Sequence, residues 1–390
     1  MHVQNLKPLT SLRFFAALWV LIFSYWPNLA GAGAMPGLVA KGYLGVEVFF
    51  ILSGFILCHV YLPALEAGSY RYGSFVWARL ARVYPLHLAT LMAVGVMGAG
   101  AALTGRPIEH NVMSWPALLP NLTMTHAWGL TNVAGWNHSS WSISAEWFAY
   151  LSFPAFAWAA LKLKARPLAA LAGALAVMIV IYPAFQALAG FPLTQATIAW
   201  GALRIVPCFA YGCALYLVWR SGALNGRAIS LAGAFISGAA LLLGAQSGLP
   251  DMGIAMAGGA LIFFLAVLSN QSKGWLSAPA FVYLGEISYA IYMIHVPWAL
   301  LFINGVAAVG GATGEVLPLW LWIVFTVAVI PLSAAAHHLI ERPARDGLKR
   351  LAARWGGRGG QDTVNKKTLY SSLGEIGLFR AAFGKGAPRA

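Results

Sequence analysis

The feature that most constrains the fold is a series of apolar segments, each long enough to cross a lipid bilayer. A spanning helix needs roughly 20 predominantly apolar residues, and about ten segments have that length. These runs lack the alternation that a membrane β-barrel requires. The sequence therefore predicts an all-α polytopic membrane helix bundle with helices near 8–27, 43–63, 74–99, 141–163, 168–189, 197–219, 229–246, 252–269, 278–302 and 316–340.

Composition supports a membrane protein over a soluble one. The chain is 60% hydrophobic and only 9% charged, and its mean hydropathy of +0.72 exceeds that of soluble domains. The first apolar segment, followed by the small residues AGAGA, also has features of a secretory signal peptide. Because further apolar segments follow it, we interpret it as an uncleaved first helix.

Lysine and arginine predict the orientation of the bundle. Cytoplasmic loops are enriched in these residues, and with the N-terminus inside, the outer loops carry only Lys41 and Arg106. Ten helices then place both termini in the cytoplasm. The net charge of +14 is therefore mostly a topology signal, and we expect contact with membrane lipids but not with nucleic acid.

Two regions are predicted. Residues 1–345 form the transmembrane domain, and residues 346–390 form a basic cytoplasmic tail, partly disordered because it lacks an apolar pattern. No internal repeat of the kind found in many transporters is evident.

Ionisable side chains inside the predicted helices are candidates for function. Each costs about 2.5–3.5 kcal/mol to insert, so each needs a partner or a role. For several of them the alternative is a salt bridge or hydrogen bond that only holds the bundle together. They are Arg13, Glu47, Glu146, Arg204, Glu286, His295, His337 and His338.

Arg13 and Ser24 are predicted to share one face of the first helix. They are eleven residues apart, which corresponds to a rise of about 16 Å and three turns with about 20° to spare. Arg13 would lie deep and Ser24 near the outer surface. Serine is common at helix contacts in membranes, so Ser24 alone indicates no function.

Arg79 and Arg82 are three residues apart, at the predicted cytoplasmic end of the third helix. They therefore lie on one helix face. Guanidinium groups bind phosphate oxygens in pairs, so this pair suits a phosphate-bearing ligand. The alternative is that both are ordinary positively charged residues of the inner side.

Several stretches, in order along the chain, together resemble the acyltransferase 3 family of ten-helix membrane enzymes that acylate extracytoplasmic sugars. They are SLRFFAALWVLIF, GYLGVEVFFILSGFIL, FVWARLARVYPLH, WNHSSWSISAEWFAYLSFP, RIVPCFAYGCALY, GEISYAIYMIHVP and HHLIERPAR. The resemblance implies that Arg79 and Arg82 meet the phosphates of acyl-CoA. It also implies that Arg13, Glu146 and His295 occupy family positions in the catalytic region.

The chain departs from the family at position 24. Where the family has a histidine regarded as the catalytic base, this chain has Ser24. Imidazole suits proton removal near neutral pH, and a serine hydroxyl does not. Three explanations remain open: a deliberately inactivated acyltransferase, a natural homologue that has lost catalysis, or an enzyme that recruits another base such as His295. A serine acyl carrier would need its own base.

The resemblance predicts an O-acyltransferase of the bacterial inner membrane. It would move an acyl group, most simply acetyl from acetyl-CoA, to a hydroxyl of an extracytoplasmic glycan or glycolipid, directly or through an acyl-enzyme. Trp141, Arg204 and Glu47 are predicted to contact the acceptor or to form framework, and no metal is expected. The alternatives are a transporter or flippase and a catalytically silent partner protein. The sequence indicates no oligomeric state.

Overall fold

The computed structural model describes residues 6–105, 112–224, 226–269, 274–310 and 316–356. Most of these residues are helical, and these ranges contain no strand beyond a single β-bridge between Leu29 and Leu317. The predicted all-α fold class is confirmed. Arg106 of the predicted outer loop, and the part of the predicted tail beyond residue 356, lie outside these ranges.

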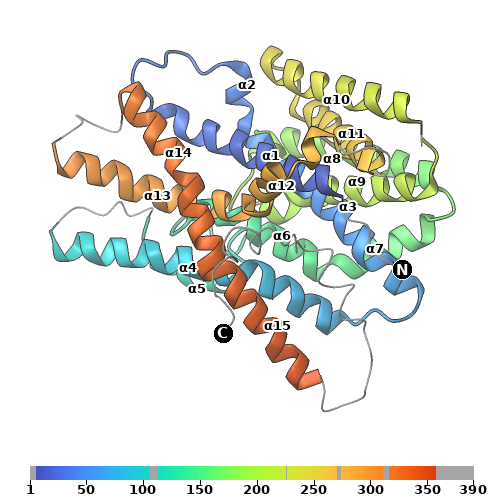
Figure 1. Cartoon of the computed structure of the whole chain (residues 1–390), viewed down its shortest axis with the longest axis horizontal. Coiled ribbons are helices and arrows are strands. Elements are labelled where there is room, and N and C mark those ends of the chain that lie inside the picture. Colours follow the sequence, from blue (N-terminus) through green and yellow to red (C-terminus); the bar gives the residue numbers. More distant parts are fainter. Residues whose placement is uncertain (1–5, 106–111, 225, 270–273, 311–315, 357–390) are drawn as a thin grey trace, which may run out of the picture.

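Within the described ranges, nine helices are long and apolar enough to cross a membrane. Most of the long helices run in a similar direction and form one bundle (Figure 1). These spanning helices are α1 (Lys7–Tyr25), α3 (Gly45–Glu66), α4 (Tyr72–Leu103), α8 (Pro167–Ala189), α9 (Gly201–Ser221), α10 (Arg227–Ser247), α11 (Asp251–Ser269), α13 (Ser288–Ala308) and α14 (Leu319–Ala336).

The predicted helix near 141–163 is broken. Its two halves are α6 (Trp141–Leu151) and α7 (Phe153–Leu163), each 11 residues long. Pro154 lies in the first turn of α7, where its missing N–H and its ring cannot continue the preceding helix. The predicted helix near 278–302 is likewise divided into α12 (Pro279–Glu286) and α13, with Ile287 between them.

The chain leaves α14 through a π-helical turn, His337–Glu341, and continues as α15 (Arg342–Gly356). Figure 1 shows α14 and α15 as an oblique pair that crosses the direction of the other helices. The first residues of the predicted tail are thus helical. The remaining short elements are α2 (Gly37–Ala40), α5 (Leu118–Leu122), and the 3₁₀ turns Trp26–Asn28, Gly42–Leu44, Trp115–Ala117, His138–Ser140, Leu193–Gln195 and Trp275–Ser277.

Two glycines allow a close helix crossing in the core, between α3 and α9. A Cβ atom built on Gly54 would lie 2.1 Å from the carbonyl oxygen of Phe209, and one built on Gly212 would lie 2.0 Å from that of Ile51. Each glycine therefore faces the backbone of the other helix. Small residues at such crossings allow membrane helices to approach closely.

We predict that Gly54→Ala and Gly212→Ala each destabilise the protein by about 1–3 kcal/mol, because the added methyl group overpacks a backbone contact. Thermal unfolding of the detergent-purified protein would measure the loss. Gly173→Ala in α8 is the matched control, since nothing lies within 4 Å of a Cβ built there. Equal midpoints for all three variants would contradict the packing argument.

A buried histidine holds the segment before α6. The exposed fraction of His126 is 2%; its Nε2 lies 3.1 Å from Ser140 Oγ, and its ring stacks on that of His87. Burial, with a smaller contribution from nearby histidines, lowers the pKa of His126 to about 3. The folded protein therefore keeps this imidazole neutral.

This shift predicts acid sensitivity. In the unfolded chain His126 takes up a proton near its ordinary pKa of about 6.5, whereas the folded chain does so only near 3. Keeping His126 neutral costs no stability above pH 6.5. Below that pH the free energy of unfolding falls as the pH drops toward 3, by about 1.4 kcal/mol at pH 5.5. Between pH 7.5 and 5.5, His126→Gln should lose less thermal stability than the wild type. Equal losses would rule out this contribution.

Candidate active site

A cavity of about 150 Å³ lies between α1, α3, α4, α6 and α13. Four of the predicted site residues line it: Arg13 from α1, Arg79 and Arg82 from α4, and Glu146 from α6. Residues far apart in the sequence are thus brought together at one place inside the bundle. The cavity lies beside α1, as an acyl-donor site next to Arg13 would require.

Arg13 contributes a guanidinium group without a direct partner. Among the described residues it makes no hydrogen bond or ion pair, and the carboxylates of Glu146 and Glu286 act on it only through longer-range electrostatics. A guanidinium group has five N–H donors, and a charge inside a bundle needs compensation. Arg13 is therefore available to a ligand in the cavity.

Arg79 is held by aromatic rings. Its Nη2 donates a hydrogen bond to Tyr61 Oη at 3.2 Å, and its guanidinium carbon lies 5.5 Å and 5.9 Å from the ring centres of Tyr61 and Tyr150. Its Nε is buried and has no hydrogen-bond partner among the described residues. These cation–π contacts fix the orientation of the side chain and leave most of its donors unused.

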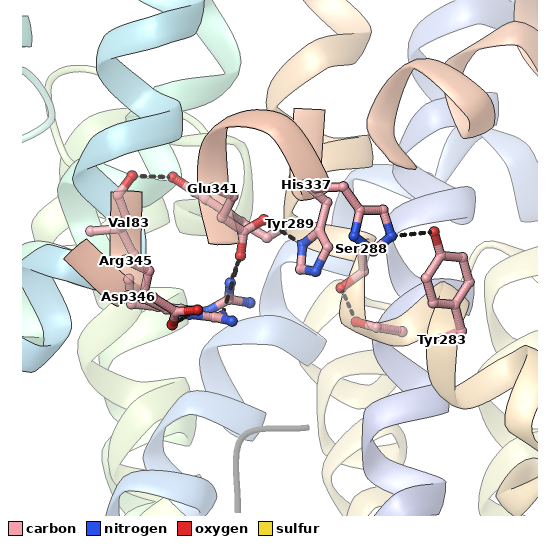
Figure 2. Close-up of polar contacts among 11 residues, drawn as sticks. Val83, Tyr283, Ser288, Tyr289, His337, Glu341, Arg345 and Asp346 are labelled. Atoms are coloured by element: carbon pink, nitrogen blue, oxygen red, sulfur yellow. Dashed lines mark hydrogen bonds and ion pairs between the residues drawn. The ribbon is translucent and has the colours of Figure 1, made fainter. Parts of the chain in front are cut away.

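Arg82 forms an ion pair with Glu341, a carboxylate that the sequence reasoning did not consider. Glu341 is fully buried and also lies 3.0 Å from His337 Nδ1 and 3.7 Å from Arg345 Nη1. Figure 2 shows His337 and Arg345 pointing toward this carboxylate. The signal was present in the stretch HHLIERPAR, whose glutamate lies one residue beyond the predicted end of the last helix.

Glu146 lies in the cavity, where it accepts two hydrogen bonds. Ser53 Oγ donates to its Oε1 at 2.8 Å and Tyr150 Oη donates to the same atom at 2.6 Å. Its Oε2 has no hydrogen bond to a described residue. Ser53 and Tyr150 were not predicted, although Tyr150 lies one helical turn after Glu146 and therefore on the same face.

Glu47, Arg204 and Trp141 form a separate, closed cluster. Arg204 Nε and Nη2 donate to the two oxygens of Glu47 at 2.6 Å and 3.0 Å, and its Nη1 donates to the carbonyl of Ala196 at 2.8 Å. Its guanidinium carbon lies 4.6 Å from the ring centre of Trp141. All three side chains are buried. Because every nitrogen of Arg204 is engaged, the contacts favour the framework interpretation, and acceptor binding stays a prediction.

His295 lies just beyond the cavity on α13. Its Nδ1 is 2.6 Å from the carbonyl oxygen of Tyr292, and Tyr292 lines the cavity. A carbonyl oxygen can only accept, so Nδ1 carries the proton and Nε2 of the neutral ring has a free lone pair. Tyr25 Oη donates to the carbonyl of His295 at 2.6 Å, which joins the outer end of α1 to this site.

Ser24 lies in the last turn of α1 and is half-buried. It precedes Tyr25, the residue bonded to His295, but it does not line the cavity that contains Arg13. Of the two residues predicted to share one face of α1, only Arg13 therefore reaches the cavity. The catalytic role of position 24 stays a prediction. Within the described ranges, no group of three or more His, Cys, Asp or Glu side chains is arranged to hold a metal ion.

Comparison with known proteins identifies the family. Residues 8–338 match the family described as an acyltransferase domain. The acyltransferase MdmB of Streptomyces mycarofaciens is 30% identical over 323 residues, which are 75% of this chain and 79% of that protein. Nodulation protein 10 of Rhizobium leguminosarum bv. viciae is 24% identical over 369 residues, 88% of this chain and 94% of that protein.

No solved structure matches the chain significantly. The transporter alternative gains no support from these relatives. The match covers nearly all of the membrane part and includes six of the seven stretches on which the resemblance was based, and the first two residues of the seventh, HHLIERPAR. The chain therefore belongs to the acyltransferase 3 family.

Proposed function

We propose that this membrane acyltransferase takes its acyl group from cytoplasmic acyl-CoA and transfers it to a hydroxyl of an extracytoplasmic glycan or glycolipid. The observation that carries the proposal is the cavity with Arg13, Arg79 and Arg82 on its wall. These three guanidinium groups share the cavity with one carboxylate, that of Glu146, and Arg82 also pairs with Glu341. Arg13 and Arg79 form no ion pair among the described residues, and such charges are costly to leave uncompensated, which favours an anionic ligand. Acetyl is the simplest group for a cavity of about 150 Å³.

The phosphates of CoA would be bound by Arg79 and Arg82 at the inner end, as forked guanidinium groups favour. The pantetheine arm would then extend past Arg13 toward the outer end of α1. Arg13 would polarise the thioester carbonyl or stabilise the oxyanion that forms on it. Glu146, fixed by Ser53 and Tyr150, would hold Arg13 and Arg79 in place through its charge.

The reaction itself is an acyl transfer. The acceptor oxygen attacks the thioester carbon, a base removes its proton, the C–S bond breaks, and the CoA thiolate leaves and is protonated. The base would lie at position 24, and Ser24 lacks the required pKa. The free Nε2 of His295 is a substitute base beside the cavity, because His295 contacts the lining residue Tyr292.

We expect acyl transfer to localise to the bacterial inner membrane, since the donor is cytoplasmic and the acceptor lies outside. The family description and the name of the relative MdmB support acyl transfer in general. The acceptor class is the part of the proposal that needs a direct assay with candidate glycans.

Removing either inner arginine should weaken CoA binding. A charge-assisted hydrogen bond contributes about 1.5–3 kcal/mol, so Arg79→Ala should raise the Kd roughly ten- to 150-fold, measured by calorimetry in detergent. Arg82→Ala should raise the Kd by a similar factor. It is tested as the double variant with Glu341→Gln, so that the buried carboxylate of Glu341 is not left without a partner. Arg220→Ala is the control, because Arg220 forms its ion pair with Glu66 at the exposed surface. Unchanged affinity in both test variants would refute the phosphate role.

Restoring histidine at position 24 should raise the rate. General-base catalysis contributes about 10²–10⁴-fold, so Ser24→His should increase acyl transfer from radiolabelled acetyl-CoA in membranes by at least about 100-fold. Ser24→Gln is the control, since it adds a comparable side chain without a base. A wild type that is already as active as Ser24→His, and that is silenced by His295→Gln, would assign the base to His295 instead.

A further inference from the structure

Helix α15 packs against the half of α4 that carries Arg79 and Arg82. Trp77 Nε1, from the same part of α4, donates a hydrogen bond to the carbonyl oxygen of Leu348 at 3.0 Å. The two helices are in contact along several residues. This bond fixes the backbone of α15 against α4 one residue before Lys349.

Lys349 joins an existing group of cations. Arg345, Arg79 and Arg82 all act on it electrostatically, and the carboxylate of Asp346 opposes them. Arg345 and Lys349 are four residues apart and share one face of α15. Like charges that are held together destabilise one another unless an anion lies between them.

The carboxylates of this region are fewer than its cations: Glu286, Glu341 and Asp346 face Arg13, Arg79, Arg82, Arg342, Arg345 and Lys349. Glu341 is shared among Arg82, Arg345 and His337, and Asp346 lies 3.9 Å from Arg345. Lys349 is half-buried and, among the described residues, makes no hydrogen bond or ion pair. Its ammonium group therefore has three donors without a protein acceptor in the described ranges.

We infer that Lys349, with Arg345 beside it, completes a phosphate-binding mouth on the inner side of the cavity. The ligand class is the nucleotide half of a thioester carrier, which bears a diphosphate and a further phosphate on its ribose. Arg79 and Arg82 alone do not match this number of anionic groups, since Arg82 is already paired with Glu341. The inference rests on the proposed function and adds binding residues from the segment after the last spanning helix.

The phosphate of a lipid headgroup has the same chemistry and could also pair with Lys349. Basic residues next to the cytoplasmic membrane surface commonly bind anionic lipids. The two sources of phosphate differ in whether the contact with Lys349 depends on a lipid bilayer. A lipid contact requires the membrane, whereas a contact with the donor persists in a detergent that contains no phosphate.

The test compares Lys349→Gln with Arg350→Gln in a maltoside detergent. Arg350 is the neighbouring residue of α15, carries the same charge and is exposed. Lys349→Gln should raise the Kd of CoA about tenfold, as expected for the loss of one charge-assisted contact, and should leave the affinity for pantetheine unchanged. Arg350→Gln should leave both unchanged. Equal thermal midpoints of the variants exclude a folding defect.

The outcomes separate the inference from the proposed function. A wild type that binds CoA through Arg79, together with a Lys349→Gln variant that binds it equally well, overturns the inference and leaves the proposed function standing. A wild type that binds no CoA overturns both. An effect of Lys349→Gln that appears only in bilayers with phosphatidylglycerol, and not in detergent, assigns Lys349 to lipid and also overturns the inference.

Discussion

Compensation of buried charge is the constraint on which the arrangement of this bundle depends. Hydrocarbon offers no hydrogen bonds, so an arginine inside the membrane must find a carboxylate, a carbonyl, an aromatic face or a ligand. Arg204 is compensated completely, because Glu47, Ala196 and Trp141 engage its whole guanidinium group. Arg13 lines a cavity and is not compensated in this way. This difference separates the part of the bundle that supports the fold from the part that can bind an anion.

Glu341 connects the cavity to the end of the chain. The π-helical turn after α14 brings this carboxylate and His337 onto one side, and π-helical turns occur frequently at functional sites. Because Glu341 pairs with Arg82 of α4 and lies near Arg345 of α15, it joins α4, the π-helical turn and α15 beside the cavity. If Arg82 binds the donor phosphates as proposed, the anion competes with Glu341 for the same guanidinium group, and binding is coupled to the position of α15.

The sequence was sufficient for the class of fold and for four charged residues of the cavity wall, Arg13, Arg79, Arg82 and Glu146. Length and apolarity predict spanning helices without tertiary information, and the three-residue spacing of Arg79 and Arg82 places them together on any helix. Tertiary contacts were not predictable in the same way. The pairing of Arg82 with Glu341 depends on how the chain turns after α14, and the closed set of contacts around Arg204 depends on the crossing of α3 and α9. The break before Pro154 had a local signal, whereas the continuation of helix α15 to Gly356 depends on its packing against α4.

The separation of Arg13 from Ser24 has a consequence for how this chain differs from an enzyme with histidine at position 24. The two residues are about 16 Å apart along α1, and only Arg13 lines the cavity. The guanidinium groups on the cavity wall come from α1 and α4, whereas Ser24 does not line the cavity. A substitution in the last turn of α1 therefore leaves the charges around the cavity in place. On the proposed roles, loss of a base at position 24 is physically independent of the donor site, because a chain with Ser24 keeps the three guanidinium groups of the cavity wall.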